Sequence, residues 1–331
     1  MKTGKESFIN QRPVFHSYFL HYIYPSYHSF SCVMIGLKKM KEMKKDVRVF
    51  VMSLCVIGFA LPSCDLLEKR RASKEELEKR GVARYKGLSP QSGLTPVFSF
   101  VRIEEGEFFM GEEGAPVEIR KPFMMMTTEV TQEQWFQVMG GNSLRFKKKG
   151  DCENWDSVNK ICPDNPVEQV SWDDVKYYIR KLNVLSGLKG CEGRPGDPSG
   201  CYRLPTEAEW EWAVRAGTRT AYFFGNDPSH LWRYAIYNIN SEGRTHKVKG
   251  DRLPNRNGLY DVYGNVWEWV EDAWQSRLPG GKDPLVATGI NRVVRGGGWF
   301  SHAESLRTTD RNKFSPNVKY NFIGFRLVKT L

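Results

Sequence analysis

The sequence contains few of the residues that hold metal ions in enzymes. Its 331 residues include seven cysteines and six histidines. No two cysteines are spaced as C-x-x-C, and the three histidines that follow Cys64 are not arranged as H-x-x-x-H or H-E-x-x-H. These absences exclude the usual short zinc-binding motifs.

Concentrated basic charge is also missing. The formal net charge is +11, but residues 1–63 carry nine Lys and Arg against three acidic residues. More than half of the positive excess therefore precedes Cys64. The rest of the chain shows no basic helix and no alternation of basic and aromatic residues, which nucleic-acid-binding proteins often have. We expect no nucleic-acid partner.

The N-terminal region has no apolar run of comfortable length for a membrane-spanning helix. Residues 49–61 form an uncharged apolar segment with the length of a signal-peptide core, and basic residues precede it. The segment ends in LPSC, which resembles a bacterial lipobox, so Cys64 is the predicted site of lipid attachment. An ordinary secretory signal, or a short anchor helix with an incidental cysteine, is the alternative.

These features divide the chain into four predicted segments. We interpret residues 1–42 as upstream sequence translated from a start codon set too early, with Met43 as the true start. Residues 43–63 are the predicted lipoprotein signal peptide, residues 64–96 a tether and residues 97–331 the folded domain. We expect an exported protein that is anchored to the membrane through lipid on Cys64 and faces the periplasm or the cell surface.

Four cysteines remain for the folded domain if Cys64 carries lipid. Cys152 and Cys162 enclose one short loop rich in Gly, Pro and Asn, and Cys191 and Cys201 enclose another. An even number of cysteines in an exported chain suits disulfides. Zinc is the rival use, but no histidine lies near either pair in the sequence. We predict the disulfides Cys152–Cys162 and Cys191–Cys201.

Few regular elements are predicted between the loops. Residues 97–111 alternate enough to form a pair of strands with turns at Gly106 and Gly111. Three helices are expected after Thr131, Ser171 and Thr206, because Gln, Asp or Glu follows three residues later and completes a capping box. The chain beyond residue 215 is rich in Gly, Asn, Asp and Pro. We expect a loop-rich α+β fold with few short helices and antiparallel strands.

Six motifs occur in the same order as in one known family. They are EVTQEQW, NPVEQVSWDDV, YRLPTEAEWEWAVRAGT, GLYDVYGNVWEW, RVVRGG and IGFRLV. The chain therefore resembles the sulfatase-modifying factor family, whose formylglycine-generating-enzyme-like domains have a fold distantly related to C-type lectins. The resemblance covers about residues 97–331 and implies the same fold.

The resemblance also implies an active site that this chain has lost. Active members use two thiols that hold copper(I), a soft ion suited to thiolate ligands, and oxidise a substrate cysteine to formylglycine. The matching positions are Ser301 and Leu306, so we expect neither copper nor formylglycine production. An oxidase or other enzyme on the same scaffold is the alternative. Iron enzymes of the family carry an additional His-rich region, which the sequence lacks.

The resemblance implies a calcium site in the motif GLYDVYGNVWEW. Its ligands would be the side chains of Asp261 and Glu268 and the carbonyl oxygens of Gly264 and Val266. Carboxylates and carbonyls in a glycine-containing turn are the oxygen ligands that calcium takes. A hydrogen-bonded turn with no ion is the alternative.

The resemblance finally places the opening of the family's cleft at the C-terminal segment. The predicted cleft residues are Trp299, Phe300, Ser301, His302, Glu304, Asp310 and Asn312, with Phe314, Tyr320 and Phe322 close by. Ser301 and His302 cannot form a catalytic dyad, because neighbours on an extended chain point to opposite faces. This segment also resembles variable ligand-binding lipoproteins, with RGG-W and a closing GFRLV. We therefore expect a module that binds an unknown ligand or protein partner, or has a structural role.

Overall fold

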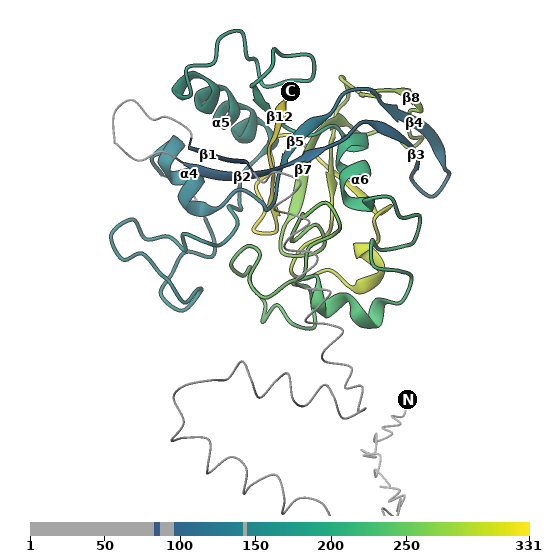
Figure 1. Ribbon diagram of the computed structural model, residues 1–331. Coiled ribbons are helices and arrows are strands. Elements are labelled where there is room, and N and C mark those ends of the chain that lie inside the picture. Colours follow the sequence, from purple (N-terminus) through teal and green to yellow (C-terminus); the bar gives the residue numbers. More distant parts are fainter. Residues whose placement is uncertain (1–82, 87–95, 142–143) are drawn as a thin grey trace, which may run out of the picture. The chain divides into compact units, whose positions relative to one another are not determined.

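The computed structural model describes residues 83–86, 96–141 and 144–331 (Figure 1). The predicted upstream extension, signal peptide and Cys64 lie outside these residues, as does most of the predicted tether. Within the described part of the chain, no helix combines the length and the apolar character needed to cross a membrane.

The central sheet has five antiparallel strands in the order β1-β2-β5-β12-β6. They are β1 (Ala83–Lys86), β2 (Val97–Ile103), β5 (Phe123–Met126), β12 (Val328–Thr330) and β6 (Tyr202–Arg203). β1 lies inside the segment predicted as a tether. The sheet therefore extends further toward the N-terminus than the sequence indicated, because ARYK pairs with the free edge of β2.

The remaining strands form two smaller sheets. One has the order β10-β9-β7-β11 and the other the order β3-β4-β8. Their members are β3 (Gly106–Met110), β4 (Ala115–Ile119), β7 (Trp267–Ala273), β8 (Gly281–Lys282), β9 (Arg292–Arg295), β10 (Arg311–Phe314) and β11 (Ile323–Gly324). The pairs β7–β11 and β4–β8 are parallel, so the expected antiparallel pairing has two short exceptions.

The predicted strand pair in residues 97–111 forms as two strands that do not pair with each other. β2 pairs with β1 and β5, whereas β3 pairs with β4. Gly106 begins β3 against the Trp212 ring, where a Cβ would lie 2.8 Å from the nearest ring carbon. Both predicted strands therefore form, but each pairs with other strands, and the predicted pairing of the two with each other was wrong.

All three predicted helix starts are confirmed. The helices are α4 (Gln132–Met139), α5 (Trp172–Leu185) and α6 (Glu207–Arg215), and each is preceded by a complete capping box at Thr131, Ser171 or Thr206. Two short 3₁₀ helices follow, η1 (Pro228–Arg233) and η2 (Ala303–Leu306). Capping boxes are local, so their sequence pattern is a reliable signal.

The central sheet is buried on both faces, and β5 shows this most clearly. Met124 and Met126 belong to one apolar cluster, which includes residues of α4 and α5. Phe123 and Met125 belong to a second cluster, which includes Trp210 of α6. Successive side chains of a strand point to opposite faces, so α4 and α5 cover one side of the sheet and α6 the other (Figure 1).

Candidate functional site

A glycine turn leads from β9 into the segment where family members carry their thiols. Gly296 and Gly297 have φ angles of 90° and 78°. A Cβ on Gly296 would lie 2.8 Å from the carbonyl oxygen of Val262, and one on Gly297 would lie 2.0 Å from Leu306 Cδ2. Both the positive φ and the close contacts require glycine. The turn therefore brings residue 306 against residue 297.

Ser301 and Leu306 both lie at this turn, and both side chains have a structural role. The Ser301 Oγ accepts a hydrogen bond of 3.0 Å from the backbone N–H of Gly298, and the residue is buried. Leu306 is fully buried in the second apolar cluster. A hydroxyl and an isobutyl group here provide no ligand for copper(I).

His302 and Ser301 have different partners. His302 is exposed, and its Nδ1 lies 2.8 Å from the Asn238 Nδ2. The backbone N–H of Asn238 donates to the carbonyl oxygen of Ser301 at 3.2 Å. The neighbouring hydroxyl and imidazole therefore have separate partners and do not form a nucleophile–base pair.

Five aromatic residues near this turn form one connected cluster, which we call the aromatic surface: Trp299, Phe300, Phe314, Tyr320 and Phe322. Tyr320 and Phe322 stack with ring centroids 4.9 Å apart. Phe300 meets Phe322 at 4.7 Å, and Phe314 meets Tyr320 at 5.3 Å. Phe300 is 43% exposed and Tyr320 39%. These two side chains give the cluster a face toward solvent, on which a ligand could bind.

The other predicted cleft residues do not join the aromatic surface through a described contact. Asp310 accepts a hydrogen bond from the Arg307 backbone N–H at 3.0 Å and forms an ion pair with its guanidinium at 3.2 Å. Glu304 lies in η2, and Asn312 lies on β10. Both Glu304 and Asp310 act electrostatically on Tyr222, whose pKa is raised chiefly by burial. The predicted set therefore divides into an aromatic part and a charged part.

Glu168 supports the aromatic surface from within, and sequence reasoning missed it. Its Oε1 accepts hydrogen bonds from the backbone N–H groups of Arg145 and Phe146 at 2.8 and 2.9 Å. The Phe146 ring then meets Trp299 edge-on at 5.7 Å. Burial raises the pKa of Glu168 to about 7, against the lowering effect of those two N–H groups. The available signal was a charged residue directly after Val167 in NPVEQVSW.

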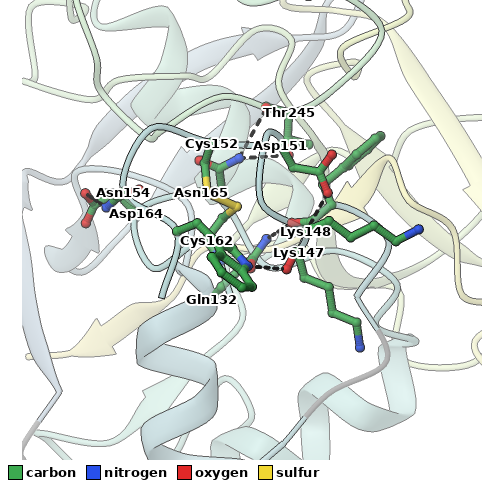
Figure 2. The surroundings of a disulfide bond; sticks show 12 residues. Gln132, Lys147, Lys148, Asp151, Cys152, Asn154, Cys162, Asp164, Asn165 and Thr245 are labelled. Atoms are coloured by element: carbon green, nitrogen blue, oxygen red, sulfur yellow. Dashed lines mark hydrogen bonds between the residues drawn. A yellow bond between two sulfur atoms is a disulfide. The ribbon is translucent and has the colours of Figure 1, made fainter. Parts of the chain in front are cut away.

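The first disulfide holds the same region in place. Cys152 and Cys162 are bonded, as predicted. Gln132 connects this loop to the neighbouring segment, because its Oε1 accepts from the Cys162 backbone N–H and its Nε2 donates to the Phe146 carbonyl oxygen (Figure 2). The second predicted disulfide, Cys191–Cys201, is also present.

The predicted calcium turn contains one free carboxylate oxygen. Asp261 is buried, and its Oδ2 accepts a hydrogen bond from the Lys249 backbone N–H, while its Oδ1 has no hydrogen-bond partner among the described residues. Glu268 differs from the prediction, because its oxygens already receive the Arg326 guanidinium at 2.6 and 2.7 Å and the Trp210 N–H at 2.8 Å. The orphaned oxygen of Asp261 fits a cation better than Glu268 does.

A third carboxylate, Glu129, lies beside this turn. It accepts hydrogen bonds from the Asn265 side chain at 2.9 Å and from the Val266 backbone N–H at 3.1 Å. Burial, followed by the charges of Asp261 and Glu268, raises its pKa well above the usual value. Within the part of the chain that the structure describes, only one guanidinium, that of Arg326, forms an ion pair with these acids. Among the described residues, no group of three His, Cys, Asp or Glu side chains is placed to hold a metal ion, so main-chain carbonyls would have to contribute.

The sequence comparison decides the family. Residues 85–331 match the family described as sulfatase-modifying factor enzyme 1-like domain. The chain belongs to this family. The match begins within β1, in agreement with the position of that strand in the central sheet.

Three relatives of this family member are informative. The formylglycine-generating enzyme of Streptomyces coelicolor is 34% identical over 50% of this chain and 52% of its own length. The chaperone protein LppX of Paenibacillus barcinonensis is 27% identical over 75% of this chain and 96% of its own length. The solved structure of Treponema denticola variable protein 1 is 29% identical, covers 75% of this chain and 99% of its own, and superposes with a TM-score of 0.64. The chain thus spans about half the length of the Streptomyces enzyme but nearly all of the other two.

Proposed function

We infer that this family member is an exported, membrane-tethered lipoprotein whose domain binds a ligand or a protein partner and does not make formylglycine. One observation carries the inference. The two positions that would hold thiols are Ser301, whose hydroxyl accepts from the Gly298 N–H, and Leu306, which is part of the core. The family's fold is kept, but neither side chain is a suitable ligand for copper(I).

The aromatic surface is the proposed binding face. Phe300 and Tyr320 are exposed on it, and Phe146 contacts its Trp299 ring edge-on. Exposed aromatic side chains supply large contact areas at low entropic cost in binding. The near-complete match to a relative named as a chaperone protein supports a protein partner, and the disulfides support an oxidising compartment.

A calcium ion at Asp261 would serve this fold structurally. Asp261 Oδ1 and the carbonyl oxygens of Gly264 and Val266 would hold it, and the ion would offset the excess of buried negative charge around Glu129 and Glu268. The backbone N–H of Trp299 donates to the Asn265 carbonyl oxygen, which links this turn to the aromatic surface.

The proposed absence of formylglycine production is tested with the pure protein, copper(I) and a Cys-x-Pro-x-Arg peptide under oxygen. We expect no tight copper(I) binding and no aldehyde product by mass spectrometry. The variant Ser301→Cys with Leu306→Cys is the positive control for copper, because both side chains lie at the same glycine turn. Copper-dependent peptide oxidation by the natural protein would establish the alternative, an oxidase on this scaffold.

The lipoprotein proposal has an independent test. Mass spectrometry of the protein from its native membrane should find an acylated Cys64 as the first residue, and Cys64→Ala should release the protein from the membrane fraction. An intact bond between Ser63 and Cys64 in the mature protein would contradict it, whatever the result with copper.

A further inference from the structure

Four cationic side chains lie next to the aromatic surface, in a stretch that we call the basic segment: Arg145, Lys147, Lys148 and Lys149. Lys147 is half-buried and the other three are exposed. Among the described residues, none of the four has an ion-pair partner. Figure 2 shows the Lys147 and Lys148 side chains extending away from the first disulfide. The basic segment therefore presents positive charge that the described part of the protein does not neutralise.

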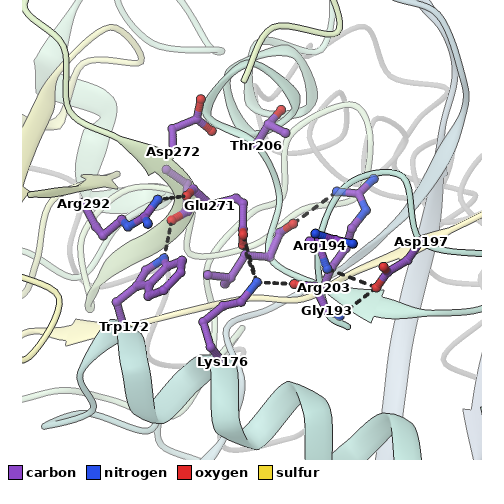
Figure 3. A network of polar contacts seen from close by, with 12 residues as sticks. Trp172, Lys176, Gly193, Arg194, Asp197, Arg203, Thr206, Glu271, Asp272 and Arg292 are labelled. Atoms are coloured by element: carbon purple, nitrogen blue, oxygen red, sulfur yellow. Dashed lines mark hydrogen bonds and ion pairs between the residues drawn. The ribbon is translucent and has the colours of Figure 1, made fainter. Parts of the chain in front are cut away.

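Two other lysines of the protein show the contrast. Lys176 is buried, and its Nζ lies 2.8 Å from a carboxylate oxygen of Glu271 (Figure 3). Lys319 is half-exposed and forms an ion pair with Asp174 at 2.7 Å. A single unpaired lysine on a protein surface is ordinary. The basic segment differs because its four cations lie within residues 145–149, beside exposed aromatic rings.

The basic segment is held against the aromatic surface at two points. The Phe146 ring meets Trp299 edge-on at 5.7 Å. The Phe146 backbone N–H donates to Glu168 at 2.9 Å, and the N–H of the next residue, Gln169, donates to the Tyr320 carbonyl oxygen at 2.9 Å. Glu168 and Gln169 thus connect the backbone of the basic segment to that of the aromatic surface. The cationic and aromatic side chains belong to one region of the protein.

Hydrogen bonds also fix the backbone of the basic segment. The Lys148 N–H donates to Asp151 Oδ2 at 2.8 Å, and the Asp151 N–H donates to the Lys148 carbonyl oxygen at 2.9 Å. The Trp155 side chain donates to the Lys147 carbonyl oxygen at 2.8 Å, and the first disulfide follows directly in the chain. A backbone that is already ordered loses little conformational entropy when a partner binds.

The exposure of the aromatic rings favours a protein partner over a lipid surface. Phe300 is 43% exposed and Tyr320 39%, so neighbouring residues cover more than half of each side chain. Phe314 and Phe322 are only partly exposed. Apolar groups that bind a membrane enter the boundary of headgroups and acyl chains by about 5–10 Å, which requires protruding side chains. Rings that pack on one another instead offer faces and edges against which the apolar side chains of a partner can pack.

We propose that the basic segment and the aromatic surface together bind a protein segment that carries acidic and apolar side chains close together in its sequence. The acidic side chains would lie at residues 145–149, and the apolar ones on Phe300 and Tyr320. This inference rests on the proposed function, because it uses the same binding face, and it adds the chemistry of the partner. Opposite charges favour association and set the orientation, while aromatic contact contributes to affinity.

The test is selection of random displayed peptides of about 12 residues, a length that spans a linear recognition motif. The full-length protein with Cys64→Ala is used at physiological salt, so that attached lipid does not contribute. We expect the enriched peptides to have a net negative charge and to contain aromatic or aliphatic side chains. No enrichment, or enriched peptides without net negative charge, would overturn the proposal. Neutral or basic peptides that still need Phe300 would overturn the acidic partner and leave the proposed binding function intact.

Two charge-reversed proteins locate the acidic contacts. Lys148→Glu combined with Lys149→Glu should weaken binding of the most enriched peptide at least about tenfold, as measured by fluorescence anisotropy. Lys121→Glu combined with Lys189→Glu makes the same change in net charge at two exposed lysines elsewhere and should leave the affinity unchanged. Equal weakening by both pairs would show attraction to the net charge of the protein and would contradict the assignment to the basic segment.

A second matched pair locates the apolar contacts. Phe300→Ser should weaken peptide binding at least about fivefold. Phe109→Ser, at a 51% exposed phenylalanine on β3, should leave it unchanged, and circular dichroism checks that both variants are folded. Peptide binding that survives Phe300→Ser would refute the role of the aromatic surface. Vesicles of phosphatidylglycerol are the lipid probe: vesicle binding that is lost on reversal of Lys148 and Lys149, with no peptide enriched, would assign the surface to a membrane instead.

Discussion

Leu306 lies directly against Gly297: a Cβ on the glycine would be 2.0 Å from Leu306 Cδ2. Gly297 also has a φ of 78°. This position therefore needs glycine both for its backbone angle and for its close contact with Leu306. The position where an active relative would carry its second thiol is here a side chain packed in the core. Two glycine-to-alanine substitutions can separate the effect of backbone strain from the effect of overpacking against Leu306.

Gly297→Ala should lower the free energy of unfolding by about 2–4 kcal/mol, because backbone strain adds to overpacking against Leu306. Gly243→Ala is the matched control, since Gly243 has a φ of 72° with no atom within 4 Å of its Cβ position. It should cost only about 1 kcal/mol, the strain alone. Urea denaturation measures both, and equal losses would mean that Leu306 moves aside freely.

The buried carboxyl of Glu168 should make stability depend on pH. Its pKa is about 7 in the folded protein, against an ordinary 4.5, so between those values the native state keeps a proton that the unfolded chain releases. Stability should therefore fall as pH rises through this window, by about 3 kcal/mol in total for this group. Arg145 opposes the shift and Asp151 favours it.

Glu168→Gln isolates this contribution. The amide oxygen can still accept from the Arg145 and Phe146 N–H groups, but it does not ionise. We expect the variant to be more stable than the natural protein above pH 7 and similar to it near pH 5, as measured by denaturation at both pH values. A constant difference across the range would show that Glu168 does not titrate there.

Removal of either disulfide should destabilise the protein by about 2–3 kcal/mol, because each closes a loop of 10 residues. Removal of the two disulfides should have different local effects. The Cys152→Ser, Cys162→Ser protein should also show altered Trp299 fluorescence, since Gln132 couples that loop to Phe146. The Cys191→Ser, Cys201→Ser protein should instead leave that fluorescence unchanged. The opposite pattern would contradict the coupling of the first loop to Phe146.

Calcium should raise the melting temperature of the natural protein, by mass action on the folded state. Asp261→Ala should remove this response, and its melting temperature should be the same with calcium and with a chelator. Asp251→Ala, at an exposed position near the turn, should keep the full response. A natural protein that melts at the same temperature with calcium and with chelator would mean that the turn holds no ion.

The candidate site was predictable only where its residues lie within one local motif. The resemblance to the family grouped Trp299, Phe300, Tyr320 and Phe322 at the predicted cleft, and the structure brings them into one cluster. The sequence did not separate Asp310 from these aromatic residues. Asp310 is paired with Arg307, three residues earlier, and the sequence does not give the direction of the Arg307 side chain. Glu168 was missed because long-range packing alone buries it.

The sequence by itself determined the three capped helices, the two disulfide loops and the family motifs, since each depends on residues close together in the chain. Only the tertiary structure decided that β2 and β3 separate, that β1 extends the sheet, and that Glu268 meets Arg326. Strand pairing and buried ion pairs join residues from distant parts of the chain, and their energy depends on burial that no local pattern records.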